Sequence, residues 1–129
     1  MTDIALTSAQ VRIINPDNAE VFNCIAGEAL SKGDIVYFDT AGKAKKADGS
    51  AAGTAQARGV ALSTVGDKGA LSILKRGLCA GFTVTGLNGD VRVFISDTAA
   101  KLADAAGTVG VIAGRVMIML DNPDLTKVV

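Results

Sequence analysis

Hydrophobic and polar residues alternate along several short stretches of the chain, as they do in β-strands that bury one face. The stretches lie at residues 21–27, 35–39, 57–63, 70–77 and 91–96. In the last of them, Val91, Val93 and Ile95 share one face. Gly and Asp residues separate the stretches, so the pattern predicts short strands joined by tight turns.

Three segments carry other signals. The apolar run 110–120 predicts a pair of central strands or one bent strand, with Gly114 at the bend. Asn88-Gly89 is a step typical of a two-residue hairpin turn. The segment 98–107 is rich in Ala, Leu and Lys and predicts the only helix, a short one that Thr98 could cap. The alternative is a loop that mirrors residues 40–53.

Part of the sequence occurs twice. Gly33-Asp34 recurs as Gly89-Asp90 after 56 positions, and Asp39-Thr40 recurs as Asp97-Thr98 after 58. The segment from residue 57 maps onto the one from residue 113, again after 56. This spacing indicates one supersecondary unit built twice, at about 33–62 and 89–118, whose apolar faces cover each other. The predicted fold is all-β, a small β-barrel or sandwich.

The predicted body spans residues 21–122, between an N-terminal arm (1–20) and a C-terminal tail (123–129). The arm carries five large apolar side chains, which would be exposed if it extended from the body; they are Ile4, Leu6, Val11, Ile13 and Ile14. We expect it to contact a partner surface or another subunit by adding a strand or filling a groove. The alternative is an edge strand packed on its own barrel.

The composition of the chain argues against several classes of function. Apolar residues make up 49% of the chain and aromatic residues only 4%, which predicts a core of Val, Ile, Leu and Ala. Lys plus Arg and Asp plus Glu both number 13, so the basic surplus of a nucleic-acid-binding protein is missing. No apolar run approaches the roughly 18 residues of a membrane span. The start of the chain has no secretory signal pattern, which predicts synthesis in a cytosol.

Candidate chemistry is sparse. The chain has no His, so the usual hydrolytic triads and zinc sites are disfavoured. Cys24 and Cys79 stand apart in apolar contexts and predict buried free thiols, with a disulfide only if their strands are neighbours. Six Asp residues adjoin Gly, Ser or Thr and are interpreted as turn residues: Asp34, Asp39, Asp48, Asp67, Asp90 and Asp97. We therefore expect no enzyme, no cofactor and no metal site.

One turn resembles a known modification site. The stretch "GDKGA" at 66–70 is similar to the lysine-bearing hairpin of lipoyl-type carrier domains, although that family's flanking acidic residues are absent. The similarity implies a carrier function as an alternative, with Lys68 as its single candidate residue.

Over about residues 27–120, the order of strands and turns resembles the decoration, or head-stabilising, proteins of tailed bacteriophages. The resemblance rests on "GDIVYFDTAGK", "ARGVAL", "ILKRG", "GDVRVFISDTAAKL" and "GRVMI" in that order. It implies a β-barrel-like subunit, commonly a homotrimer, which binds the major capsid protein on the outer capsid surface of the virion. Such a protein is made in the bacterial host cytoplasm and stabilises the head against the pressure of packaged DNA. A virion-surface receptor- or glycan-binding module is the alternative within the same setting.

Overall fold

A computed structural model describes residues 2–14, 16–83, 89–117 and 127–128, and in these residues the chain is all-β. The strands are β1 (Ala5–Leu6), β2 (Arg12–Ile14), β3 (Glu20–Ile25), β4 (Ile35–Phe38), β5 (Ala44–Lys46), β6 (Gly59–Ala61), β7 (Ala70–Arg76), β8 (Leu78–Ala80), β9 (Phe82–Thr83), β10 (Arg92–Ile95), β11 (Leu102–Ala103), β12 (Ile112–Met117) and β13 (Lys127–Val128). Two single 3₁₀ turns, η1 (Ser8–Gln10) and η2 (Pro16–Asn18), are the described helical elements.

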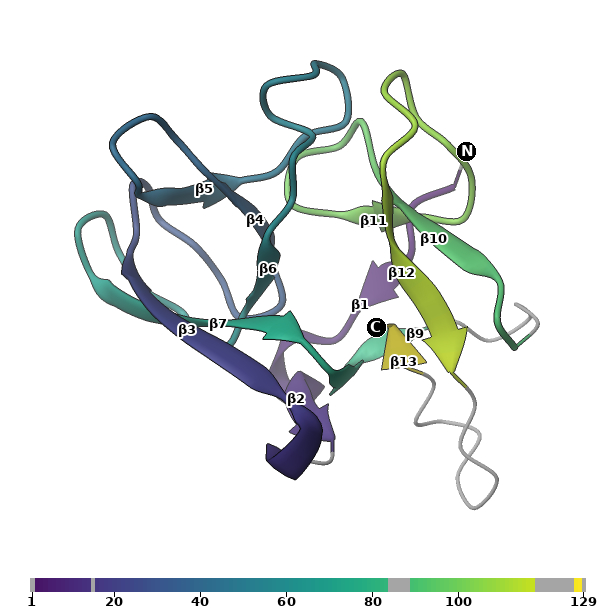
Figure 1. Cartoon of the computed structure of the whole chain (residues 1–129), viewed down its shortest axis with the longest axis horizontal. Helices are drawn as coiled ribbons and strands as arrows, with labels where there is room; N and C mark the ends of the chain where they lie inside the picture. The colour runs from purple at the N-terminus through teal and green to yellow at the C-terminus, as the bar shows by residue number, and fades with distance from the viewer. Residues whose placement is uncertain (1, 15, 84–88, 118–126, 129) are drawn as a thin grey trace.

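The strands form three antiparallel sheets. One sheet has the order β3-β7-β6-β4-β5, a second has the order β11-β10-β12-β13-β8-β2, and β1 pairs with β9. Figure 1 shows the five-stranded sheet on one side, β10 to β12 on the other, and β1 between them. The described strands do not close into a barrel, so the molecule is the sandwich form of the predicted all-β fold.

The main core lies between the five-stranded and six-stranded sheets. Ile35 and Leu74 enter it from the first sheet, and Val93, Ile95 and Val116 enter it from the second; all five are buried. Because side chains alternate along a strand, Val36 and Phe38 of β4 lie on the opposite face from Ile35. This alternation gives the five-stranded sheet a second apolar face.

A smaller outer cluster covers that second face. Its buried members are Ala26, Leu30, Val36, Ala44, Ala61, Leu71 and Ile73. The segment between β3 and β4 supplies the cover, because Leu30 and Val65 exchange two backbone hydrogen bonds of 2.9 Å. The five-stranded sheet is therefore packed on both faces.

The sequence repeat corresponds to repeated strand pairing. Val36 pairs with Gly59 in the first unit, and Arg92 pairs with Arg115, each 56 positions further on, in the second. A register shift opposite Val93 and Phe94 leaves Ala113 of β12 as an extra residue. The connection from β10 to β11 is longer by one residue than the connection from β4 to β5. The longer connection accounts for one of the two residues by which the offset grows from 56 to 58 inside the unit.

The predicted helix at 98–107 is wrong, and the alternative loop is present. Lys101 N–H donates to Thr98 O over 3.3 Å in a turn, and Leu102 then pairs with Ile95 in the sheet. Leu102 is only 1% exposed in the main core. Burial of this side chain and the strand pairing outweigh a helix propensity of a few tenths of a kcal/mol per residue.

Both ends of the chain belong to the sheets. β1 pairs with β9 and β2 pairs with β8, so the first segment is not an arm separate from the body. In the predicted tail, β13 lies between β12 and β8. The predicted Asn88-Gly89 turn is described only from residue 89. Residues 118–126 and 129, which include the end of the predicted body, also lie outside the described residues.

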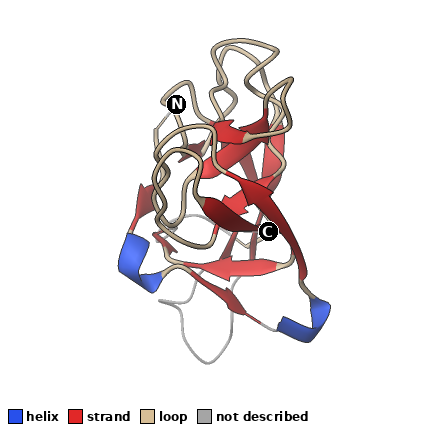
Figure 2. Ribbon diagram, turned by 90° about the vertical axis from the view of Figure 1, so that its left-hand side faces the viewer, coloured by secondary structure: helices blue, strands red, loops and turns tan. Residues whose placement is uncertain are grey.

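Loops gather at one end of the molecule, and the two helical turns lie toward the other (Figure 2). At the loop end, segments of both units are joined. Gly49 N–H donates to Ser96 O, and Val109 N–H donates to Gly49 O, each over 2.8 Å. The two units are therefore connected by backbone hydrogen bonds as well as by the main core.

Candidate interaction surface

The five apolar residues predicted to contact a partner lie mostly inside the molecule. Ile4 and Val11 are 6% and 1% exposed in the main core, and Leu6 and Ile13 pack against it. Ile14 is half-buried. This corrects the expectation of a free arm, because Ile4 and Val11 are buried by their own chain. The alternative, an edge strand packed on its own body, describes β2.

Hydrogen bonds fix the start of the chain. Thr2 N–H donates to Asp104 Oδ1 over 2.9 Å, and Asp104 N–H donates back to Thr2 O over 3.1 Å. The buried Ser96 hydroxyl donates to the Asp3 carboxylate. These partners are about a hundred residues away in sequence, which explains why the alternation in the first segment did not reveal them.

Val11 also packs where only a residue without a side chain fits. At Gly81, with φ of +109°, a Cβ atom would lie 2.7 Å from Val11 Cγ2. Such a distance is well inside van der Waals contact. The backbone of β8 and β9 therefore approaches the first segment closely, and the segment is a tightly packed part of the body.

Three of the four exposed large apolar side chains in the described residues lie on β3, and the fourth is Ile112 on β12. Strand β3 is at the edge of the five-stranded sheet and pairs only with β7 in the described sheet. Val21, Phe22 and Ile25 are 47%, 45% and 44% exposed. An edge strand presents unpaired backbone N–H and C=O groups, which another chain can use to add a strand. We call these three side chains and the open edge of β3 the β3 edge.

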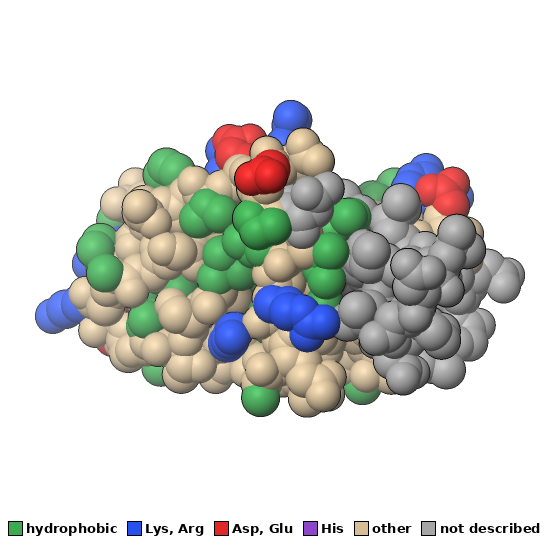
Figure 3. All heavy atoms as spheres, turned by 90° about the horizontal axis from the view of Figure 1, so that it is seen from below, with side chains coloured by type: hydrophobic (Ala, Val, Ile, Leu, Met, Phe, Trp, Pro, Cys, Tyr) green, Lys and Arg blue, Asp and Glu red, His purple; other side chains and the backbone are tan. Residues whose placement is uncertain are grey.

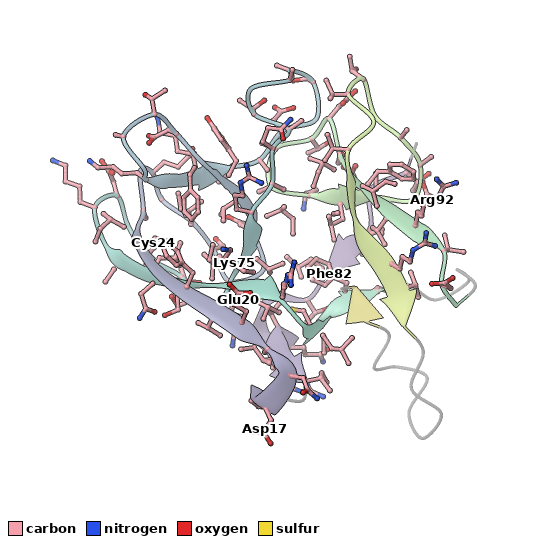
Figure 4. The ribbon with its side chains drawn as sticks, in the orientation of Figure 1. Asp17, Glu20, Cys24, Lys75, Phe82 and Arg92 are labelled. Carbon is pink, nitrogen blue, oxygen red and sulfur yellow. The ribbon has the colours of Figure 1, made fainter. Side chains whose placement is uncertain are left out.

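Protection against such pairing is confined to the beginning of β3. Glu20 carries the strand's charge, and a register shift separates it from Val21. The Glu20 carboxylate lies 3.6 Å from Lys75 Nζ, and Figure 4 shows the two side chains together at the front of β3 and β7. Charges and bulges are the usual means of blocking an edge. From Val21 to Ile25 the strand has no charged residue, and directly after the strand Ala26 bridges to Ala44 of β5. The edge is therefore open from Val21 to Cys24.

Phe22 is ordered by its neighbours although it is exposed. Its ring packs edge-to-face with Phe38 at a centroid distance of 5.7 Å, and Lys75 Nζ lies 5.7 Å from the ring centre. Aromatic pairs and cation–π contacts of this geometry contribute roughly 0.5–1.5 kcal/mol. The β3 edge therefore presents an aromatic side chain with little entropy left to lose on binding.

Hydrophobic side chains gather in the middle of the face that Figure 3 shows, with acidic and basic groups together above them and Lys or Arg groups below them. This is the lower face of the molecule in Figure 1. An apolar centre with a charged rim is typical of protein-contact surfaces. The arrangement therefore favours protein contact on this side of the molecule.

The pattern of apolar residues does not show that β3 is an edge strand. Residues 21–27 were predicted as a strand, but the order of strands in the sheet decides which strand is an edge. The available signal is weak: "VFNCI" has apolar residues on both faces of the strand, without the alternation of a half-buried strand. In the structure Cys24 faces the outer cluster, whereas Val21 and Ile25 are exposed.

Acidic residues lie in turns, as predicted. Asp39 Oδ1 accepts hydrogen bonds of 2.9 Å from the N–H groups of Ala41 and Lys43. The bond from Lys43, with further contributions from Ala41 and Lys45, holds the pKa of Asp39 below its ordinary value. Asp48 accepts from Ser50, which lowers the pKa of Asp48. These carboxylates stabilise local backbone.

Both cysteines are free thiols, as predicted. Cys24 is half-buried on β3 and Cys79 is buried on β8, in different sheets. Burial raises the pKa of both thiols, that of Cys79 to about 11. A thiol with a raised pKa is mostly protonated at neutral pH and a poor nucleophile.

Lys68 lies at an exposed turn between Val65 and β7. Its backbone adopts φ of +68°, and its N–H donates to Ala26 O over 2.9 Å. The side chain is accessible, as a modified lysine must be, while the backbone of the turn is anchored to the end of β3.

Within the described residues, His, Cys, Asp and Glu do not assemble into a group of three that could hold a metal ion. No described helix is long and apolar enough to cross a membrane. Comparisons with protein-family models, curated proteins and solved structures found no match to this chain.

Proposed function

We propose that this protein is a structural virion protein that binds the outside of a phage capsid and stabilises the head against internal DNA pressure. The observation that carries the proposal is the β3 edge, which combines three exposed apolar side chains with an unpaired strand edge. The resemblance to decoration proteins gives the partner, the major capsid protein, and the homotrimeric state. The site of action is the outer capsid surface.

Binding proceeds by strand addition. An extended segment of the capsid protein pairs with the open backbone of β3 and covers Val21 and Ile25 on one face of the strand and Phe22 on the other. Backbone pairing supplies affinity without demanding one partner sequence, and the apolar side chains fix the register. The same edge on each subunit of a trimer binds three capsid subunits at once, which raises avidity.

The stabilising action follows from how the subunit is built. Two strands from opposite parts of the sequence, β2 (Arg12–Ile14) and β13 (Lys127–Val128), are hydrogen-bonded into the six-stranded sheet. A pull on a capsid segment bound at β3 passes to β7 along six paired residues. Such a unit resists separation of the capsid subunits that it connects.

Capsid co-sedimentation with purified protein tests the proposal. Val21→Lys places a charge on the open edge, and we expect its affinity for capsids to fall at least about tenfold. Ile112→Lys is the matched control, because Ile112 is a comparably exposed aliphatic residue on β12, at 49%. The proposal fails if the wild-type protein does not bind capsids at micromolar concentration, or if both variants lose binding equally. Sedimentation equilibrium tests the trimer, and a monomer at those concentrations contradicts that part.

A carrier-type function is the second candidate and rests on the exposed position of Lys68. Mass spectrometry of the protein purified from its native host distinguishes the two functions. A mass increase localised to Lys68 supports the carrier, whereas unmodified Lys68 with retained capsid binding supports the structural protein.

A further inference from the structure

A cavity lies at the seam between the two repeated units, between β6 and β7 on one side and β12 on the other. Its volume is about 120 Å³. Ile35, Val60 and Leu74 line it from the five-stranded sheet, and Leu102 and Ala113 line it from the second unit. The lining is therefore mainly aliphatic, and both units contribute to it.

Two arginines border this cavity, Arg58 and Arg76. Arg58 directly precedes β6, Arg76 ends β7, and these two strands are neighbours in the sheet. Two positively charged groups on the border of one cavity repel each other, and an anion between them removes the repulsion.

Neither arginine forms an ion pair within the part of the chain that the structure describes, although Glu20 is the cross-strand neighbour of Arg76. The ion pairs found there join Lys45 to Asp39, Lys75 to Glu20, and Arg115 to Asp90. Lys75 also borders the cavity, but Glu20 already lies 3.6 Å from its amine. Arg58 and Arg76 are exposed, and their guanidinium groups are open to a ligand.

The rest of the lining does not oppose an anion. Asp and Glu are absent from the described lining residues. Cys79 contributes a thiol whose pKa is raised by burial to about 11, so this group is uncharged at neutral pH. The cavity thus combines an aliphatic interior with a positively charged border.

We propose that the seam cavity binds an aliphatic carboxylate. A branched chain of about five carbons fills the interior, since a cavity of roughly 150 Å³ accepts benzene. The carboxylate lies between Arg58 and Arg76, which donate charge-assisted hydrogen bonds to it. The ligand is a free branched-chain acid or the C-terminal leucine of a polypeptide, which present the same chemistry. The site does not depend on the proposed capsid function.

Titration of the full chain followed by methyl NMR tests the site, with 4-methylpentanoate as the probe and uncharged 4-methylpentanamide as the matched control ligand. We expect shift changes in Ile35, Val60 and Leu74 methyls, and an affinity for the acid at least about tenfold above that for the amide. Equal affinities, or shift changes confined to other parts of the molecule, overturn the proposal.

Variants separate the charged and aliphatic parts of the site. Arg58→Gln and Arg76→Gln should each remove most of the preference for the acid, whereas Arg92→Gln, an exposed arginine on β10, should keep it. Ala113→Leu fills the interior and should abolish binding of both ligands. If Ala113→Leu unfolds the protein, the two Gln variants, which lie at exposed positions, still test the proposal. An unchanged preference for the acid over the amide in both Gln variants contradicts it.

A second ligand distinguishes the two sources. N-acetyl-leucine carries the aliphatic chain and carboxylate of a polypeptide C-terminus. Tighter binding of N-acetyl-leucine than of 4-methylpentanoate supports a polypeptide C-terminus, and the reverse order supports a free acid. Binding of neither at 10 mM overturns the proposal.

Discussion

The two repeated units have corresponding strand pairs but differ in the residues on their outer faces. In the first unit, at 33–62, Val36 and Gly59 form a strand pair beneath the outer cluster, and Val36 is fully buried. In the second unit, at 89–118, the corresponding pair is Arg92 and Arg115, both exposed. The inner faces of both units supply the main core, whereas among the described residues only the first unit has a second apolar layer.

The contrast shows what duplication constrains in this fold. Two matching inner faces must stay apolar because each buries the other. The repeat places no second unit against the outer face of either unit. The residues on each outer face therefore depend on what packs against that face. The chain covers the first outer face with the segment that carries Leu30, between β3 and β4, and places charged residues on the second, where Arg115 lies 3.6 Å from Asp90. The following predictions test how far the units are interchangeable.

Exchange of residues between the corresponding positions 59 and 115 should have unequal effects. A Cβ at Gly59 would lie 2.6 Å from Leu74 O, so Gly59→Arg should lower the free energy of unfolding by about 3 kcal/mol or prevent folding. Arg115→Gly should cost about 1 kcal/mol, from a weaker strand and a lost surface contact. Urea unfolding measures both, and similar losses would show that the units are interchangeable here.

The repeated aspartates should also differ. Asp97 accepts hydrogen bonds from Thr108 N–H at 3.0 Å and Thr108 Oγ1 at 2.7 Å, which join two loops. Asp97→Ala should therefore lower the free energy of unfolding by about 2 kcal/mol. Asp39→Ala is the matched control, because Asp39 stabilises only its own turn, and its loss should be smaller. A larger loss for Asp39→Ala contradicts this assignment.

Alkaline pH should lower the free energy of unfolding, because the thiol of Cys79, at the seam where the units meet, ionises. Its folded-state pKa of about 11 lies above the reference value of 9.0, so its contribution to stability is complete below pH 9 and is lost as pH rises toward 11. At pH 10 the loss should be about 1 kcal/mol. Urea unfolding at pH 7 and 10 should show a smaller alkaline loss for Cys79→Ala than for the wild type or Cys24→Ala. Identical losses in all three would rule out this role for Cys79.

The smallest effect concerns the turn that each unit makes between its first two strands. Gly42 and Ala100 occupy corresponding positions with φ of +79° and +66°. A Cβ at Gly42 meets no atom within 4 Å, so Gly42→Ala should cost about 1 kcal/mol through backbone strain alone. Gly53→Ala, also in open space but without positive φ, should be neutral or slightly stabilising. Thermal unfolding measures the stability of both variants, and equal effects of Gly42→Ala and Gly53→Ala would contradict this prediction.

Much of the body was predictable from local pattern. The alternation at 35–39 and 91–96 gave β4 and β10, and the 56-residue offset matched a real correspondence in strand pairing. The helix at 98–107 was wrong because local propensity does not include the pairing of Leu102 with Ile95. The free thiols were also predictable from local sequence, because both cysteines stand in apolar runs.

The candidate surfaces depended on contacts distant in sequence. The burial of Ile4 and Val11 follows from their packing in a core built from both sheets, which alternation in the first segment does not show. β3 is an exposed edge because of the strand order, and the seam cavity joins residues from 35 to 113. Such sites become visible only once the sheets are assembled.

The position of β13 has a consequence for synthesis on the ribosome. This strand joins β12 to β8 in the middle of the six-stranded sheet, so the two halves of that sheet have no described strand pairing with each other without it. Translation delivers Lys127–Val128 after the other described strands, and an exit tunnel delays their emergence further. The five-stranded sheet can form before Lys127–Val128 emerge, whereas the six-stranded sheet must wait for them. Domains generally fold as units as the chain emerges. In this protein, completion of the sandwich is tied to the appearance of two residues near the end of the sequence.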